Sequence, residues 1–213
     1  MNYICKCKKT NFLKKEYTYW EDRQVTTDEL DIINFLKKSN SFNFKSILHI
    51  GIGNSFFAKN FYKNNKIIGL SVSKKEINKA NKLNLSNYDV YLCDKYSKEF
   101  KQLLSDIRFD LIIDTNLKSY SCCMDAFNYF LVNLIDKLNK NGTLITSKNG
   151  MNWFKKLKPK LSFNLKKFFY YKLKEVSGDK DNILTINELE SFSKNYNLKM
   201  YLDKKLCYLK KND

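Results

Sequence analysis

Two glycines that directly follow a short apolar run are the residues with the clearest chemical potential. Residues 46–50 read Ser-Ile-Leu-His-Ile, and Gly51-Ile-Gly53-Asn54 comes next. Glycines after a strand permit a tight turn and let a ligand approach the backbone closely. A helix predicted near residues 55–63 would direct its first amide groups into the same space. We therefore predict a ligand-binding loop at Gly51, Gly53 and Asn54, with an ordinary strand-to-helix turn as the alternative.

Polar side chains also follow two later apolar runs. Asp94 comes after residues 89–93, and Asp114-Thr-Asn116 comes after residues 109–113. Open α/β sheets bind ligands beyond the carboxyl ends of their strands, so these positions are site candidates. Asp114 and Asn116 would position a reacting group on a substrate, or Asp114 would cap the next loop through its carboxylate.

His49, the only histidine, lies two residues before the first loop glycine. An imidazole titrates near neutral pH, so His49 could act as a general base or anchor a ligand. It could equally be a buried strand histidine whose ring bonds a backbone carbonyl. The sequence leaves both interpretations open.

These candidates depend on strands and helices that alternate along the chain. Short apolar runs predict strands at residues 46–50, 66–70, 89–93, 109–113 and 143–146. Helical spacing predicts helices at residues 27–38, 55–63, from 73, near 100–104, at 122–139 up to Asn141-Gly142, and at 185–195. Residues 198–202 and 206–209 predict a closing hairpin or one bent strand. The alternation predicts an α/β fold: a doubly wound, mostly parallel sheet with helices on both faces, in three α/β/α layers.

The chain is strongly basic, with 39 Lys and Arg against 22 Asp and Glu and a formal charge of +17. Such a charge fits either a polyanion-binding surface or a drift of composition toward lysine. Arginine, which grips phosphates bidentately, occurs only as Arg23 and Arg108, so we favour drift.

The six cysteines have no spacing typical of a zinc site, so no metal is predicted. No apolar run reaches the roughly 18 residues of a membrane span, and the first residues lack the apolar core of a secretory signal. We therefore expect reduced thiols, no transmembrane segment and a cytoplasmic protein. The sequence does not indicate an oligomeric state.

The order of strand, Gly-x-Gly loop, helix, strand, helix and strand over roughly residues 45–150 resembles the class I S-adenosylmethionine-dependent methyltransferases. The resemblance implies a Rossmann-like methyltransferase fold, S-adenosylmethionine as cofactor and methyl transfer to an acceptor. In that family the first loop holds the methionine part of the cofactor, which implies Gly51, Gly53 and Asn54 here. The residue after the third strand contacts adenine, which implies Asp94.

The family also implies roles for residues near the other strand ends. Residues after the fourth strand face the substrate, so Asp114 and Asn116 are implied as catalytic residues, with Asp114 also beside the cofactor. The usual acids two residues before the first glycine and at the end of the second strand are replaced by His49 and Ser71. Both would then contact the cofactor, and His49 would be a third catalytic candidate. Ser55 replaces the third loop glycine.

The chain lacks the Asn-Pro-Pro-Tyr and Pro-Cys motifs of nucleic-acid methyltransferases, which favours a small-molecule acceptor. Two alternatives stay open. One is a non-catalytic methyltransferase-like module that binds RNA or a protein partner. The other is a Rossmann-like enzyme that uses another nucleotide-type ligand or an aminopropyl donor.

We predict one domain over residues 1–213, a length that suits a single core. Its parts are an N-terminal arm and helix (1–44), a Rossmann-like core (45–150), a basic aromatic insertion (151–180) and a closing helix and strands (181–213). In the insertion, aromatic residues alternate with lysines, which fits a substrate lid, an RNA-binding surface or a membrane-surface helix. We favour the lid, because so dense an aromatic run would not stay wholly exposed.

Overall fold

The computed structural model describes residues 24–39, 44–151 and 183–212. Within these residues the chain forms a seven-stranded sheet in the order β3-β2-β1-β4-β5-β7-β6. The strands are β1 (Ser46–Ile50), β2 (Lys66–Ser71), β3 (Tyr88–Leu92), β4 (Phe109–Asp114), β5 (Leu138–Ser147), β6 (Leu198–Leu202) and β7 (Leu206–Lys211). Strands β1 to β5 are parallel, and β7 is antiparallel to both β5 and β6. The closing segment is therefore a hairpin.

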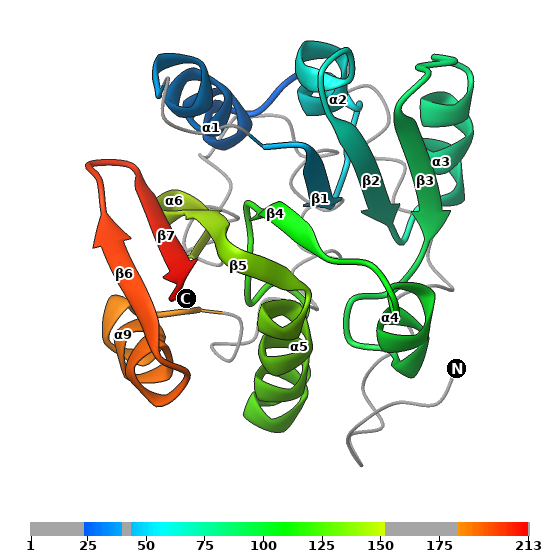
Figure 1. The fold of residues 1–213 in the computed structure, drawn as a ribbon. Coiled ribbons are helices and arrows are strands. Elements are labelled where there is room, and N and C mark those ends of the chain that lie inside the picture. Colours follow the sequence, from blue (N-terminus) through cyan, green and yellow to red (C-terminus); the bar gives the residue numbers. More distant parts are fainter. Residues whose placement is uncertain (1–23, 40–43, 152–182, 213) are drawn as a thin grey trace, which may run out of the picture.

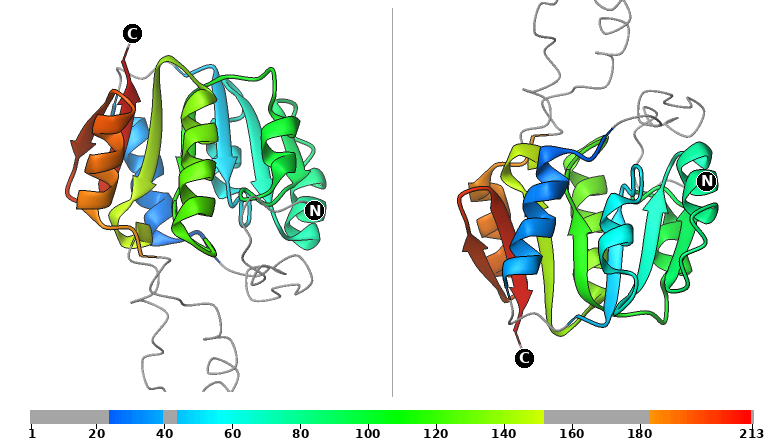
Figure 2. Two further views of the ribbon diagram at one scale, coloured as in Figure 1. Left: turned by 90° about the horizontal axis from the view of Figure 1, so that it is seen from below. Right: turned by 90° about the horizontal axis from the view of Figure 1, so that it is seen from above.

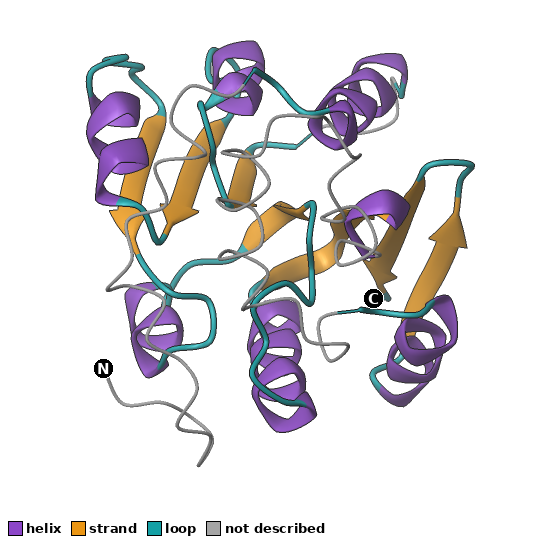
Figure 3. Cartoon of the chain, turned by 180° about the vertical axis from the view of Figure 1, so that it is seen from behind, coloured by secondary structure: helices purple, strands orange, loops and turns teal. Residues whose placement is uncertain are grey.

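Helices cover both faces of the sheet (Figure 1). One face carries α1 (Thr27–Lys38), α2 (Phe56–Phe61) and α3 (Lys74–Asn81). The other face carries α4 (Lys98–Leu103), α5 (Met124–Asp136) and α9 (Ile186–Asn195). The two groups are seen separately from above and below in Figure 2, and the same layers appear from behind in Figure 3. The predicted doubly wound, three-layer α/β/α fold is confirmed. A short helix, α6 (Lys148–Met151), follows β5.

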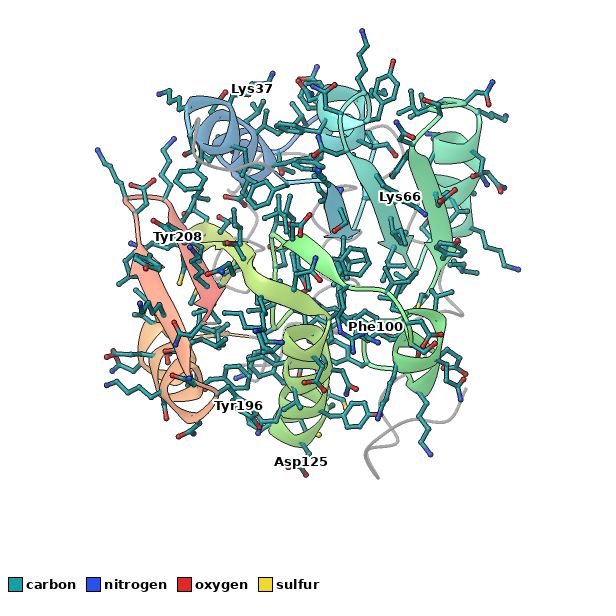
Figure 4. All side chains as sticks on the ribbon, in the orientation of Figure 1. Lys37, Lys66, Phe100, Asp125, Tyr196 and Tyr208 are labelled. Carbon is teal, nitrogen blue, oxygen red and sulfur yellow. The ribbon has the colours of Figure 1, made fainter. Side chains whose placement is uncertain are left out.

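The two faces of β1 contribute to two separate hydrophobic cores, because alternate residues of a strand point to opposite faces. Leu48 and Ile50 pack in the core beneath α4, α5 and α9. Ile47 packs in the core beneath α1 and α2. In Figure 4, Phe100 of α4 lies against the sheet, whereas Asp125 of α5 lies on the outside of the molecule. Both faces of β1, β2 and β4 are therefore buried, as expected for parallel strands covered by helices on both sides, whereas the edge strand β3 is largely exposed.

The boundary between α5 and β5 differs from the prediction. The sequence predicted a helix over residues 122–139, with Asn141-Gly142 as its end. The helix ends at Asp136 and the strand begins at Leu138, so Asn141 and Gly142 lie inside the strand. The pairing of β4 with β5 shifts register here, which marks a bulge. Asn141 has a left-handed φ of 61°, and a Cβ on Gly142 would lie 2.8 Å from a backbone carbonyl oxygen. The Asn-Gly pair therefore shapes the bulge.

The sheet order reverses at β1. From β1 the chain runs outward through β2 to β3, and it then returns to the other side of β1 with β4. A crevice forms at such a reversal, because the connections after the two strands leave toward opposite faces. The loops after β1 and β4 therefore flank the expected ligand position.

Asp110 joins three strands at the opposite, amino-terminal edge of the sheet. Its Oδ2 accepts hydrogen bonds from the N–H groups of Lys45 and Ser46, at 2.9 and 3.0 Å, and from the Ser46 hydroxyl at 3.1 Å. Its Oδ1 accepts one from the Asn139 amide at 2.7 Å. Burial alone would raise the pKa of Asp110, but these hydrogen bonds lower it overall.

We expect Asp110→Ala to lower the free energy of unfolding by about 2 kcal/mol near neutral pH, because several donors lose their acceptor. A carboxylate with a lowered folded-state pKa stabilises the fold above its unfolded pKa, and this contribution is lost as pH falls through the folded value. The difference from wild type should therefore shrink below about pH 4. Urea titrations at several pH values measure it. The control is Asp89→Ala, at an exposed strand position; equal losses in both variants would contradict the account.

Residues 1–23 and 152–182 lie outside the described residues, and with them almost all of the predicted arm and basic insertion. The lid and RNA-binding hypotheses for the insertion therefore stay predictions. Among the helices that the structure describes, none is long and apolar enough to cross a membrane. The described part of the chain also contains no group of three or more side chains suited to hold a metal ion.

Candidate ligand-binding site

The loop after β1 has the left-handed backbone that its glycines allow. Gly51 has a φ of +78° and Gly53 a φ of +53°, a region that residues with side chains rarely adopt. The N–H groups of Gly51 and Ile52 donate to the Leu70 carbonyl in β2, at 2.8 and 3.3 Å, and so hold the loop beside the end of β2. A Cβ on Gly51 would meet no described atom within 4 Å, so no described residue crowds this exposed glycine.

Ser55, at the place of a third loop glycine, also takes a left-handed φ, of 57°. Its hydroxyl lies 3.0 Å from the Tyr88 hydroxyl, and one of the two donates to the other. This hydrogen bond offsets part of the strain of a left-handed serine. Beside it, Asn54 Oδ1 accepts from the Phe56 N–H at 3.2 Å. The loop therefore keeps a glycine-type backbone although the third glycine is absent.

His49 lies on the face of β1 that α1 and α2 cover. It is 1% exposed, and its ring centroid lies 5.1 Å from that of Phe57. The Phe57 N–H in turn donates to Oε1 of the buried Glu29 in α1, at 3.2 Å. His49 thus packs beneath the start of the helix that follows the glycine loop. Such burial does not favour a role as general base on a substrate.

Ser71 is the last residue of β2 and lies beside the glycine loop. Its hydroxyl donates to Glu76 Oε2 at 2.6 Å and accepts from the Ser73 N–H at 3.0 Å. Ser71 and Glu76 are 5% and 7% exposed. Sequence reasoning missed Glu76 as a site residue, because Ser73-Lys-Lys-Glu76 matches the capping-box pattern of a helix start. The Ser73 hydroxyl does accept from the Glu76 N–H at 3.4 Å, but the Glu76 carboxylate turns to the strand end.

Asp94 follows β3 and is 6% exposed. Its Oδ1 accepts a hydrogen bond from the Tyr96 N–H at 2.9 Å. This bond fixes the Asp94 side chain at the edge of the sheet where the parallel strands end. Its Oδ2 forms no hydrogen bond with the described residues, so it is available to a ligand donor. Burial raises the pKa of this carboxyl group.

Asp114, the last residue of β4, forms a buried ion pair with Lys95. Lys95 Nζ lies 2.7 Å from Asp114 Oδ2, and the two side chains are 10% and 4% exposed. Lys95 Nζ also donates to the carbonyls of Asn116 and Leu117, both at 3.0 Å. Asp114 Oδ1 accepts from the Asn116 N–H at 3.1 Å. Both oxygens of Asp114 therefore hold the loop after β4 in place.

The loop after β4 packs closely against α6, at the end of β5. A Cβ on Gly150 would lie 1.7 Å from the Thr115 carbonyl oxygen and 2.6 Å from Asn116 Oδ1, so only glycine fits. The buried Lys118 joins this loop to the Ile183 carbonyl at 3.1 Å. A hollow of about 290 Å³ lies between α6 and the start of α9, lined by Lys148, Met151, Leu184, Thr185, Ile186 and Asn187. Asn116 thus lies on the β5 side of the site.

The pairing register brings the candidate residues to neighbouring strand ends. Ile50 pairs with Leu70 on one side and with Asp114 on the other. Ser71 pairs with Leu92, two residues before Asp94. Along the carboxyl edge the candidates follow one another in the order Asp94, Ser71 with Glu76, the Gly51–Gly53 loop, and Asp114 with Asn116. The site is thus continuous over four strands, and His49 alone of the predicted residues is turned into the core.

Comparisons with known proteins agree with this architecture. No protein-family model matches the chain, and no curated protein matches it. The N-methyltransferase NodS from Bradyrhizobium japonicum WM9, in complex with S-adenosyl-L-homocysteine, matches with a TM-score of 0.60 at 12% identity, over 88% of this chain and 89% of NodS. The plantazolicin methyltransferase BpumL, in complex with a pentazolic desmethylPZN analog and S-adenosylhomocysteine, matches with a TM-score of 0.58 at 15% identity, over 85% and 82%.

A third match is the CurJ carbon methyltransferase, with a TM-score of 0.57 at 10% identity, over 92% of this chain and 57% of CurJ. The matched structures, the strand order and the position of the glycine loop all indicate the same fold. The chain has the class I S-adenosylmethionine-dependent methyltransferase fold. At these identities the likeness defines the fold, and the activity has to be argued from the site.

Proposed function

We propose that this protein transfers a methyl group from S-adenosylmethionine to a small-molecule acceptor. The observation that carries the proposal is the left-handed Gly51–Gly53 loop, with Gly51 uncrowded by described residues, at the point where the sheet order reverses. NodS and BpumL, which share the fold, were both solved with S-adenosylhomocysteine, the product that S-adenosylmethionine leaves after methyl transfer.

We propose that the described residues contact this cofactor along its whole length. In our proposal the Gly51–Gly53 loop and Asn54 hold the methionine part, and Asp94 Oδ2 accepts a hydrogen bond from the adenine amine. Ser71 lies between these two contacts and faces the sugar together with its neighbours. The buried His49 supports the loop through its contact with Phe57, and the proposed mechanism gives it no role in proton transfer.

The cofactor supplies an activated methyl group on a sulfonium. The protein has to orient the acceptor and exclude water, which is sufficient for methyl transfer to a good nucleophile. We propose that Asn116, between the loop after β4 and α6, contacts the acceptor. Asp114 acts as a positioning residue, because both of its oxygens are held by Lys95 and by the loop.

The acceptor class can be tested with a panel of small amines, phenols and thiols. Purified protein is incubated with S-adenosylmethionine and each compound, and mass spectrometry is used to look for S-adenosylhomocysteine and a methylated product. We expect both to appear with at least one compound class. Methylation of added RNA, with no small molecule methylated, would contradict the acceptor class while leaving the cofactor in place.

A further inference from the structure

We infer that Glu76 supplies the carboxylate that binds the ribose hydroxyls of the cofactor, in place of an acid at the end of β2. The inference rests on the proposed use of S-adenosylmethionine. Ser71 occupies the strand end itself, and a serine hydroxyl alone would lack the stronger, charge-assisted hydrogen bond. Glu76 brings a carboxylate to the same place from the first turn of α3.

The sheet order determines where the sugar must lie. A ligand held at the Gly51–Gly53 loop and at Asp94 has to cross the end of β2, because β2 lies between β1 and β3. The loop is hydrogen-bonded to the Leu70 carbonyl, and the Cys93 N–H donates to the Ser71 carbonyl at 2.9 Å. The end of β2 is therefore joined directly to both contacts. The sugar links adenine to the methionine part, so it falls at Ser71 and Glu76.

The side chain of Glu76 is directed to this place and not along its own helix. In α9 the corresponding acid, Glu188, closes a complete capping box, with Oε2 accepting from the Thr185 N–H at 2.7 Å. In α3 the Ser73 N–H donates to the Ser71 hydroxyl instead, and that hydroxyl donates to Glu76. The 2.6 Å hydrogen bond from the Ser71 hydroxyl holds the Glu76 carboxylate at the strand end, and Glu76 is only 7% exposed there.

A carboxylate at this position also suits the charge of the ligand. Two neighbouring hydroxyls can both donate to one carboxylate, and such charge-assisted bonds are about twice as strong as neutral ones. A negative charge attracts the cationic sulfonium.

Calorimetric titration with S-adenosylhomocysteine, and with analogues that lack its 2′- or 3′-hydroxyl, tests the inference. We expect Glu76→Gln to weaken binding of S-adenosylhomocysteine roughly 10- to 100-fold. The variant should also lose most of the wild-type preference for the complete ribose. Glu190→Gln removes an exposed carboxylate of α9 that pairs only with Lys194 on the same helix, and this control variant should bind as wild type does. Thermal unfolding of each variant confirms that it is folded.

The outcomes separate this inference from the proposed function. If Glu76→Gln keeps both the wild-type affinity and the preference for the complete ribose, the inference about Glu76 is wrong. The proposed use of S-adenosylmethionine is then unaffected. If wild-type protein does not bind S-adenosylhomocysteine, the inference and the proposed function both fail. If Glu76→Gln does not fold, the test is the affinity of wild-type protein for S-adenosylhomocysteine and for the two analogues. Equal affinity for all three compounds overturns the inference.

Discussion

Asp114→Asn is expected to lower the free energy of unfolding by about 3 kcal/mol or more, because it removes one partner of a buried ion pair. The Lys95 ammonium would stay enclosed by the carbonyls of Asn116 and Leu117 and by aromatic rings, without its counter-charge. The substitution nearly preserves the shape of the side chain, so the loss reports on charge and hydrogen bonding. Urea unfolding of wild type and variant near neutral pH measures it.

The matched control for Asp114→Asn removes the other charge as well. Lys95→Met alone leaves Asp114 buried without its cation, so it should also destabilise the protein. In the double variant neither charge remains, and its loss should be smaller than the sum of the single losses by about 2 kcal/mol. Additive losses in the double-mutant cycle would contradict a direct interaction between the two side chains. Loss of stability in Asp114→Asn below about 1 kcal/mol would show that the pair is well solvated.

Gly53→Val is expected to weaken binding of S-adenosylhomocysteine by at least roughly 100-fold. In the proposed binding mode its side chain would enter the space through which the cofactor approaches the loop backbone. A β-branched residue at a φ of +53° would also distort the turn. Isothermal titration calorimetry of the folded variant measures the loss. The effect on binding should be much larger than the effect on stability.

A control is needed for the strain that valine introduces at a left-handed position. Asn84 has a φ of 48° in the exposed turn between α3 and β3, away from the carboxyl edge. Asn84→Val should therefore be destabilised to a similar degree and still bind S-adenosylhomocysteine as wild type does. If Gly53→Val also retains wild-type affinity, the ligand does not approach the Gly51–Gly53 loop, and the site is misplaced.

The fold was predictable from the sequence because its signals are local and repeat along the chain. Each parallel strand is a short apolar run, and β1 has the predicted bounds of 46–50. The two loop glycines were also predictable, since a left-handed turn after a strand favours glycine. The end of α5 was missed because Asn141-Gly142 is typical of helix ends as well as of bulges, and only the pairing of β4 with β5 distinguishes the two.

The contacts within the site were much less predictable, because they join residues that are distant in sequence. Nothing local distinguishes Lys95 from the other basic residues, and its partner Asp114 lies 19 positions away. Glu76 matched a capping pattern that already explained it. For His49 a signal did exist: in a strand it shares a face with Ile47, which predicts that both point into the same core. Which helices cover that face could not be read from the sequence.

Calorimetric titration of the wild-type protein with S-adenosylmethionine and S-adenosylhomocysteine, at moderate salt, tests the central claim most directly. We predict binding of both with dissociation constants of roughly micromolar order, and loss of both in Asp94→Ala, whose folding is checked by circular dichroism. Absence of binding to either compound by folded wild-type protein would contradict the account. The loss of acids at His49 and Ser71 would then mark a change of ligand, and nucleotides and RNA would be the next compounds to titrate.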